Sequence, residues 1–516
     1  MKKLFYFFLL LVLHNTALSQ YIEQNYPAEN HFFFEFKKFK NQFSKRGDQK
    51  EKLSGKIELP LPGYGVTTFI LTENTITEKR LAHILTFDGV TRNQKLSLKL
   101  TLLENSFNAA VRSDDGTYYF IESINIPGNY YKLYSFDEAM RLEQFKCFNT
   151  EDLNLKIYPT ESKSVNNFPV GNQIKKYRLA VAATGESAQE LGSSDAVLSQ
   201  IITNFNAVNL IYESELSVSF TIISETIDKV ILFDDPTTDP FSGTGAGASQ
   251  TGFNAMNASG LLTYDKYDVG HTVNIHTSTG TSGTAGGQPC NNTSKASGFS
   301  RIGTQNSLGL ISGLITHEMG HQFGASHSYN ATGGDSPGNT FCASGWSSQA
   351  AVEPGSGSTL MAYGTNCGFP VDQRYSSGNR LSPFFHAKSL DQILMNIQNS
   401  STCYSTLVSS NSIPVANAGA DITIPKNTPF RLKGIGNDNN NTNLSFTWEQ
   451  IDVATTADKG AFGSTLNGDG GYSAVNSMSA PLFRSVQSTI SGERYFPKMD
   501  FVLYNQNNPP MNEGEV

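Results

Sequence analysis

The clearest hydrophobic pattern in the chain is an apolar stripe that begins near residue 308. Its members recur mostly three and four positions apart, at Leu308, Leu310, Ile311, Leu314, Ile315, Met319 and Phe323. This spacing predicts a buried helix. Ser307 is a suitable N-cap residue, and Gly324 permits the left-handed backbone that often ends a helix. We therefore expect one well-packed helix between these two residues.

A strand, a long helix and a second strand are expected upstream of this helix. Residues 177–183 form an apolar run typical of a strand, and residues 218–223 form another. Between them, a helix of about twenty residues is predicted by the spacing of Val197, Ile201, Ile202, Phe205 and Val208. This order is typical of a twisted sheet with helices packed behind it.

The two ends of the chain have a different pattern. Residues 20 to about 165 are expected to form mostly strands, with a hairpin where residues 117–121 follow the turn-like residues 113–116. After a linker at residues 409–414, alternation at Ile422/Ile424 and Phe430/Leu432, and then residues 444–450, predict short antiparallel strands. This last region resembles PKD-like or other immunoglobulin-like modules, which implies a β-sandwich with Trp448 in its core. The tail shows no clear closure, so we expect the natural chain to continue past Val516.

Length and charge narrow the classes of function. A chain of 516 residues is too long for one ordinary domain, so about three units are expected. The net charge of −8, without clustered lysine or arginine, gives no support to nucleic-acid binding. Lys2 and Lys3, the apolar run 4–13 and the small residues 17–19 predict a signal peptide over residues 1–19. Because that run is too short to span a bilayer, we expect an exported protein without a membrane span.

The helix predicted at residue 308 ends in a set of metal-binding side chains. His317 and His321 are four positions apart and share a helix face, so both imidazoles can reach one metal ion. The turn at Gly324 can bring in His327 as a third ligand. Glu318 lies beside such a metal, in the position of a general base. Three protein ligands and an open position are typical of catalytic zinc.

These residues carry a family resemblance. His-Glu-x-x-His-x-x-Gly-x-x-His at residues 317–327 resembles the metzincin signature, and residues 353–363 resemble the Met-turn, with Met361 as its methionine. Residues 385–393 resemble the C-terminal helix of such domains. The segments are most similar to the reprolysin-like zinc proteases that bacteria secrete, over roughly residues 175–405. Tyr363 departs from the animal reprolysins and resembles the astacin-like and serralysin-like families, where this tyrosine donates to the tetrahedral intermediate; packing beneath the site is the alternative.

The resemblance implies the fold, domain organisation and activity. We expect an α+β metzincin domain at residues 166–408, a β-rich propeptide at residues 20–165, and a PKD/Ig-like module at residues 409–516. The expected activity is that of a zinc-dependent endopeptidase with Glu318 as general base. The alternative is a catalytically silent surface adhesin on the same fold. Protein substrates, a monomeric state and a secreted or cell-surface location are expected, with docking to a surface or matrix through the C-terminal module.

The cysteines raise two further expectations. Cys290, Cys342, Cys367 and Cys403 can pair in three ways in an exported chain, and the sequence does not choose among them. Cys147 is left over in the propeptide. By resemblance to the cysteine switch of some metzincins it is a candidate inhibitory zinc ligand, although residues 145–149 lack the full switch motif; an unpaired buried cysteine is the alternative.

Three other features have weaker interpretations. His271 and His276 are expected in a strand or loop rather than at a second metal. The Gly/Ser/Thr-rich run 277–287 is interpreted as a loop near an edge strand that binds extended substrate by β-augmentation. Asp234, Asp235 and Asp239 could bind calcium, with a solvated turn as the alternative. Propeptide cleavage is expected between about residues 162 and 176, where Lys175-Lys176 offers a basic pair.

Overall fold

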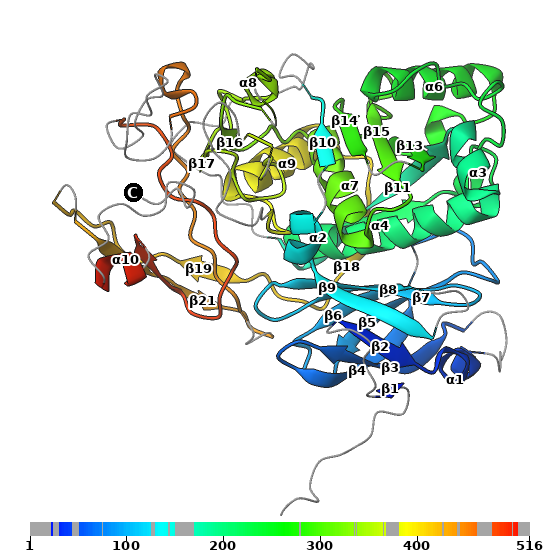
Figure 1. The fold of residues 1–516 in the computed structure, drawn as a ribbon, viewed down its shortest axis with the longest axis horizontal. Helices are drawn as coiled ribbons and strands as arrows, with labels where there is room; N and C mark the ends of the chain where they lie inside the picture. The colour runs from blue at the N-terminus through cyan, green and yellow to red at the C-terminus, as the bar shows by residue number, and fades with distance from the viewer. Residues whose placement is uncertain are drawn as a thin grey trace, which may run out of the picture.

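The protein has three parts that pack against one another (Figure 1). The structure, a computed structural model, describes residues 22–23, 30–43, 51–74, 76–124, 129–142, 145–149, 170–277, 280–334, 336, 338–364, 366–367, 381–425, 428–440, 444–461, 477–497 and 499–503. We call residues 22–142 the N-terminal sheet unit, residues 170–408 the central unit, and residues 415–503 the C-terminal segment. The expected signal peptide, residues 1–19, lies outside the described residues.

The N-terminal sheet unit is one antiparallel sheet in the order β1-β2-β9-β8-β7-β6-β5-β4-β3. Its elements are β1 (Ile22–Glu23), β2 (His31–Phe34), α1 (Phe36–Lys40), η1 (Asn41–Phe43), β3 (Ser54–Leu61), β4 (Gly65–Glu73), β5 (Leu85–Thr91), β6 (Ser97–Leu102), β7 (Phe107–Arg112), β8 (Tyr118–Ser123), β9 (Tyr130–Ser135) and α2 (Phe136–Leu142). The predicted hairpin is confirmed as β7–β8, and Gly116 supplies the positive φ of +82° that its turn requires. Rings of Phe34, Phe39 and Phe107 meet edge to face in the core.

The central unit is built on a mixed sheet in the order β10-β14-β15-β13-β11-β12, with β18 also paired to β11. Its strands are β11 (Gln173–Ala183), β12 (Val218–Ile222), β13 (Val269–His276), β14 (Thr281–Ala285), β15 (Gly298–Gly303), β16 (Tyr329–Asn330), β17 (Glu353–Pro354) and β18 (Ser405–Val408). Strand β10 (Phe145–Cys147) precedes this unit in the chain and joins its sheet beside β14. Its helices are α3 (Gly185–Leu191), α4 (Ser194–Leu216), α5 (Ser224–Ile227), α6 (Ala246–Ser259), η2 (Tyr264–Lys266), α7 (Leu308–Gln322), α8 (Phe341–Ser344) and α9 (Ala387–Asn399). The expected strand–helix–strand order is confirmed as β11, α4 and β12.

Two expectations in the central unit need correction. The run 277–287 is not only a loop, because residues 281–285 form β14, which pairs antiparallel with β15. Glycine, serine and threonine give this strand little local signal, so pairing with its neighbours decides its conformation. Lys175 and Lys176 lie inside β11 and pair with both β12 and β18, so a protease would have to open the sheet to cut there.

The N-terminal sheet unit docks onto both the sheet and the helices of the central unit. Residues 76–78 extend the far edge of the central sheet, where the Ile222 amide donates to the Ile76 carbonyl at 2.6 Å. Lys99 of β6, which is 6% exposed, forms an ion pair of 2.6 Å with Glu213 of α4. Helix α2 packs against α7, whose Gly309 leaves the space that α2 and the neighbouring strands fill. One continuous hydrophobic core therefore crosses the boundary between the two parts.

The C-terminal segment contains less regular structure than the sequence predicts. Its elements are β19 (Val415–Asn417), β20 (Phe430–Lys433), β21 (Ile435–Asn437), η3 (Thr456–Asp458), β22 (Glu493–Phe496) and α10 (Met499–Leu503), with ladders β19–β21 and β20–β22. The strand expected at Ile422 and Ile424 is wrong: both side chains are exposed and belong to no ladder. Trp448 is half-buried and donates to the Gly492 carbonyl. Within the described residues these ladders do not form a sandwich, and the PKD/Ig-like assignment stays a prediction.

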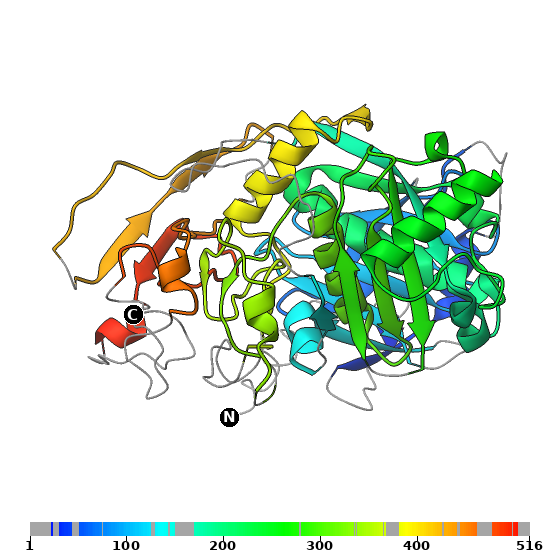
Figure 2. The ribbon, with the colours of Figure 1, turned by 90° about the horizontal axis from the view of Figure 1, so that it is seen from above.

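The C-terminal segment nevertheless packs closely on the central unit (Figure 2). Arg484 is 0% exposed and donates to the Gly357 carbonyl, beside the Met-turn loop. Ser358 donates to the Ser485 carbonyl at 2.8 Å, and Asn330 donates to the Asp458 carbonyl at 3.0 Å. The segment therefore covers the loop that carries Met361. Among the described residues, no helix combines the length and apolar character needed to cross a membrane.

Candidate metal centre

Three buried imidazoles meet at the end of helix α7. His317 and His321 lie on one face of this helix, and His327 follows the turn that ends it. The Nε2 atom of His321 lies 3.1 Å from the Nε2 atoms of both His317 and His327. All three side chains are at most 2% exposed. The three histidines predicted from the motif are thus brought together around one point.

The hydrogen bonds of the three Nδ1 atoms fix the tautomer of each ring. Each Nδ1 atom lies 2.6 to 2.8 Å from a backbone carbonyl oxygen: that of Leu360 for His317, of Ala325 for His321, and of Gly345 for His327. A carbonyl oxygen only accepts, so each Nδ1 carries the proton. In a neutral ring the Nε2 atom is then an acceptor, and three such acceptors point at one another.

The histidine rings are held neutral by their surroundings. Burial lowers the pKa of His317 to about 4, although its bond to the Leu360 carbonyl acts in the opposite direction. Burial also lowers the pKa of His321 and His327 well below the usual value, and the neighbouring histidines lower it further. Three converging lone pairs without a proton between them need a cation. Zinc–nitrogen bonds of about 2.0–2.1 Å at tetrahedral angles set ligand nitrogens about 3.3 Å apart, so the donor set fits zinc.

The turn at the end of α7 explains how His327 comes to lie beside His317 and His321. Ser307 caps α7 by accepting from the Leu310 amide at 3.3 Å, as expected. Gly324 has φ of +95°, and the Ala325 amide donates to the Gly320 carbonyl. A β-carbon on Gly324 would also lie only 2.9 Å from the side-chain Nδ2 atom of Asn396. Glycine at position 324 therefore lets the chain reverse tightly enough to present His327.

Glu318 lies against strand β14. Its side chain is 0% exposed, and an ideal β-carbon on Gly283 of β14 would lie 2.3 Å from Glu318 Oε1. Burial raises the pKa of this carboxyl well above its usual value, while the Cys147 thiol beside it acts in the opposite direction. Gly283 therefore makes the room in which the carboxylate sits, a role that the sequence analysis missed.

Met361 and Tyr363 form the floor and one wall of the centre. Met361 is buried in a turn, and the Ser328 amide donates to its carbonyl. The Tyr363 ring lies 4.6 Å from the His327 ring and 4.4 Å from that of Tyr329, measured between centroids. Its hydroxyl donates to the carbonyl oxygen of Cys147 at 2.9 Å. Tyr363 thus lies beside the histidines.

Cys147 is the fourth member of this cluster. Its thiol lies 3.6 Å from His321 Nε2, and the candidate ligand atoms of Cys147 and the three histidines all lie within 4.8 Å of one another. Strand β10 brings it there by pairing in parallel with β14 at the edge of the central sheet (Figure 1). Burial raises the pKa of the thiol well above its usual value, and the nearby Glu318 raises it further. No other group of metal-binding side chains occurs among the described residues.

The remaining predicted residues have structural roles. The disulfides are Cys290–Cys403 and Cys342–Cys367, which selects one of the three open pairings. Asp235 and Asp239 accept from backbone amides in turns, including that of Gly185, and the structure gives no support to calcium there.

His271 takes part in a buried network that the sequence analysis did not foresee. It lies on β13, as expected of a strand residue, and its Nδ1 atom lies 2.9 Å from Gln322 Oε1. Its Nε2 atom lies 2.9 Å from the Ser300 hydroxyl, and Gln322 donates to the Gly270 carbonyl at 2.8 Å. The network fixes the metal-binding end of α7 to the sheet.

The comparison with protein families agrees with this geometry. Residues 173–394 match the family described as Metallo-peptidase family M12B Reprolysin-like. The reprolysin-like match covers β11 through most of α9, and it therefore contains the three histidines, Glu318, Met361 and Tyr363. Reprolysin-like M12B peptidases use zinc, in keeping with the donor set. No curated protein matches the chain.

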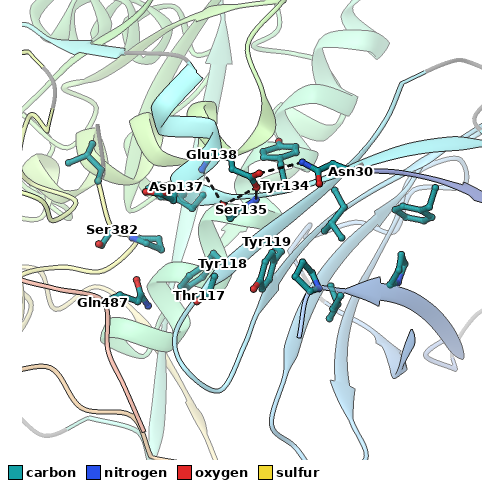
Figure 3. A pocket seen from close by; sticks show the side chains of 18 of the residues that line it. Asn30, Thr117, Tyr118, Tyr119, Tyr134, Ser135, Asp137, Glu138, Ser382 and Gln487 are labelled. Atoms are coloured by element: carbon teal, nitrogen blue, oxygen red, sulfur yellow. Dashed lines mark hydrogen bonds between the residues drawn. The ribbon is translucent and has the colours of Figure 1, made fainter. Parts of the chain in front are cut away.

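A separate cavity lies where the three parts meet (Figure 3). It has a volume of about 930 Å³, and Tyr118, Tyr119 and Tyr134 line it together with Ser382 and Gln487. Glu138 in its wall accepts from Asn30 at 3.4 Å. The four residues of the histidine and cysteine cluster do not line it, so this cavity is distinct from the reprolysin-like centre.

Proposed function

We propose that this chain is a secreted zinc-dependent endopeptidase that is made as a latent precursor. The observation that carries the proposal is the convergence of three neutral imidazoles, each oriented by a carbonyl oxygen, beside the buried carboxylate of Glu318. The reprolysin-like match over the same residues supports it. Nothing in the geometry favours the adhesin alternative, because the residues needed for hydrolysis lie together.

His317, His321 and His327 would hold the metal through Nε2, and their Nδ1 bonds would keep the rings oriented. When bound, zinc supplies Lewis acidity that polarises a carbonyl oxygen and makes water a nucleophile near neutral pH. Glu318 accepts the proton of the attacking water and passes it to the leaving amine. The Tyr363 hydroxyl donates a hydrogen bond to the oxygen that becomes negatively charged in the transition state.

Strand β14, which becomes the edge of the sheet once β10 leaves, would hold the substrate. A strand at the edge of a sheet offers unpaired amides and carbonyls to an extended peptide, which can bind as an added strand. In the structure β10 occupies this edge, with Phe148 donating to the Gly283 carbonyl at 2.9 Å. The segment from the N-terminal part of the chain thus stands where an extended substrate would lie.

This occupancy supports a latent state. The Cys147 thiol lies against His321 and Glu318, so it would take the open ligand position and keep water from the general base. We propose residues 20–165 as the propeptide, residues 166–408 as the protease domain and residues 409–516 as the PKD/Ig-like module. Export through a signal peptide at residues 1–19, by a bacterial cell, completes the proposal.

The test is hydrolysis of casein by the chain after the propeptide has been cut and separated from the rest. A site for a sequence-specific protease is inserted between residues 150 and 169, so that the C-terminal segment stays in place. We expect cleavage of casein only after the cut, and its loss with a zinc chelator and recovery on adding zinc. A cut, folded and zinc-loaded chain that leaves casein intact would overturn the assignment as a general endopeptidase.

A further inference from the structure

The segment at residues 145–149 is bound to strand β14 by side-chain contacts as well as by its backbone. The backbone pairing of β10 with β14 covers Phe145, Lys146 and Cys147, and one further backbone bond runs from the Phe148 amide to the Gly283 carbonyl. Such a short parallel ladder at a sheet edge is weak on its own. Yet Cys147 is 0% exposed and holds one position against the histidines. Further contacts must therefore keep the segment in place.

The side chain of Asn149 provides such a contact two residues after Cys147. Its carboxamide nitrogen donates to the Ala285 carbonyl at 2.7 Å, and its carboxamide oxygen accepts from the Ala285 amide at 2.9 Å. The side chain thus forms both hydrogen bonds that a neighbouring strand would form with Ala285. Asn149 is only 6% exposed, so water does not replace these bonds readily.

The carbonyl of Cys147 has its own partner on the opposite wall. Tyr363 donates to it at 2.9 Å, and the Tyr363 ring stacks on Phe341 with centroids 5.0 Å apart. Phe341 in turn meets the ring of Phe148 edge to face at 5.9 Å. Residues 147–149 are therefore held between β14 on one side and the Tyr363–Phe341 pair on the other.

We propose that Asn149 is the positioning residue of the latent state, in which its carboxamide, bound to both backbone groups of Ala285, holds Cys147 in the metal cleft. The residue types of a full cysteine-switch motif are missing around Cys147. The two hydrogen bonds between the Asn149 side chain and the Ala285 backbone fix the segment in their place. Because Asn149 leaves with the propeptide, it sets how tightly the precursor is closed and has no part in hydrolysis. The inference rests on the latency in the proposed function.

The test uses Cys147 as a reporter, because it is the one cysteine of the chain outside the two disulfides. The rate at which a thiol reagent labels it in the zinc-loaded full chain measures how often the segment leaves the cleft. All chains carry Glu318→Gln to prevent self-cleavage. The variants are Asn149→Ala and Asn149→Asp; the second keeps an acceptor for the Ala285 amide but places a carboxylate against the Ala285 carbonyl.

The control variant is Asn129→Ala, which changes an exposed asparagine of the same N-terminal part. We expect both Asn149 variants to be labelled roughly 10- to 100-fold faster than the control. Asn149→Ala loses both buried hydrogen bonds, and Asn149→Asp loses the bond to the Ala285 carbonyl and sets two oxygens against each other there. The thermal midpoint of the full chain should stay the same, and exchange of the Ala285 amide proton should speed up in Asn149→Ala. Labelling rates equal to the control in both variants would overturn the inference.

A second arm separates this inference from the proposed function. In chains with Glu318 intact and the inserted cleavage site, Asn149→Ala should raise casein cleavage before the cut and leave the rate after the cut unchanged. If no chain cleaves casein after the cut, the proposed function fails, while the labelling rates still decide the role of Asn149. A changed rate after the cut would contradict a role confined to the precursor.

Discussion

The sulfur of Met361 lies in the space that a β-carbon on Gly320 would fill. An ideal β-carbon at Gly320 would lie 2.5 Å from Met361 Sδ, so only glycine allows this close approach of α7 to the Met-turn. Gly320 directly precedes His321, and Leu360, which directly precedes Met361, accepts from His317. The turn and the metal-binding helix therefore fix one another's position.

Substituting Gly320 by alanine should disturb the metal centre through this contact. We expect Gly320→Ala to displace Met361, to weaken zinc binding about 10-fold or more, and to lower the thermal midpoint of the full chain. Zinc affinity is measured by competition with a chromogenic chelator. Gly247→Ala on α6 is the matched control, because a β-carbon there meets nothing within 4 Å. Equal zinc affinity in the two variants would show that the contact does not support the site.

Gly283→Ala should separate zinc binding from catalysis. The added β-carbon would overlap the Glu318 carboxylate and force it away, while the three histidines lie elsewhere on α7 and its following turn. Displacement of a catalytic group by about 1 Å can cost on the order of 100-fold in rate. We therefore expect full zinc content and a drop in casein hydrolysis of that order in the cut chain. Unchanged hydrolysis would mean that Glu318 does not need its present position.

The His271 network predicts a loss of stability in acid. Burial lowers the pKa of His271 to about 4 from the ordinary 6.5, whereas the bond to Gln322 acts in the opposite direction. In the unfolded chain the His271 imidazole is therefore protonated below about pH 6.5, whereas in the folded chain it is protonated only below about pH 4. Stability is highest above pH 6.5 and falls towards pH 4, by about 3 kcal/mol from this residue.

Urea unfolding of the full chain at fixed zinc concentration measures this dependence. His271→Gln should lower stability at pH 7, because it replaces a bonded imidazole. It should also reduce the fall in unfolding free energy between pH 6.5 and pH 4.5, because one titrating group is gone. Parallel pH profiles for the variant and the parent would exclude His271 as a source of the acid sensitivity.

Removal of the C-terminal segment should destabilise the central unit. A chain ending at residue 410 loses the buried Arg484 and the bonds made by Ser485 and Asp458 to the loops beneath the metal centre. It also exposes apolar surface around Trp346, because the Lys459 ammonium group that lies over the Trp346 ring is removed. We expect a thermal midpoint several degrees lower than that of the full chain, measured by calorimetry. An equal midpoint would show that the contacts of the C-terminal segment do not stabilise the central unit.

Local signals made much of the histidine cluster predictable. The spacing of apolar residues gives α7, Ser307 and Gly324 mark its ends, and residues four apart on a helix share a face whatever the rest of the fold does. His317, His321 and His327 could therefore be assigned from one short segment. Met361 was found through resemblance, since nothing local shows which residue it packs against.

Contacts between distant parts of the chain were the ones that the sequence could not reveal. Asn149 and Ala285 are separated by 136 positions, and no periodicity connects them. Strand β14 (Thr-Ser-Gly-Thr-Ala) has no large apolar side chain, so its sequence lacks the apolar alternation that predicts a strand. The packing of Arg484 against the loop that carries Met361 depends on the whole fold, so no pattern in the C-terminal sequence predicts it.

The most direct test of the account is the casein hydrolysis rate of the cut, zinc-loaded chain with Glu318→Gln, relative to the same chain with Glu318. The account predicts equal zinc content and at least about a 100-fold lower rate, because the isosteric amide cannot accept the proton of the attacking water. Hydrolysis at an undiminished rate would contradict Glu318 as the general base, and with it the proposed mechanism.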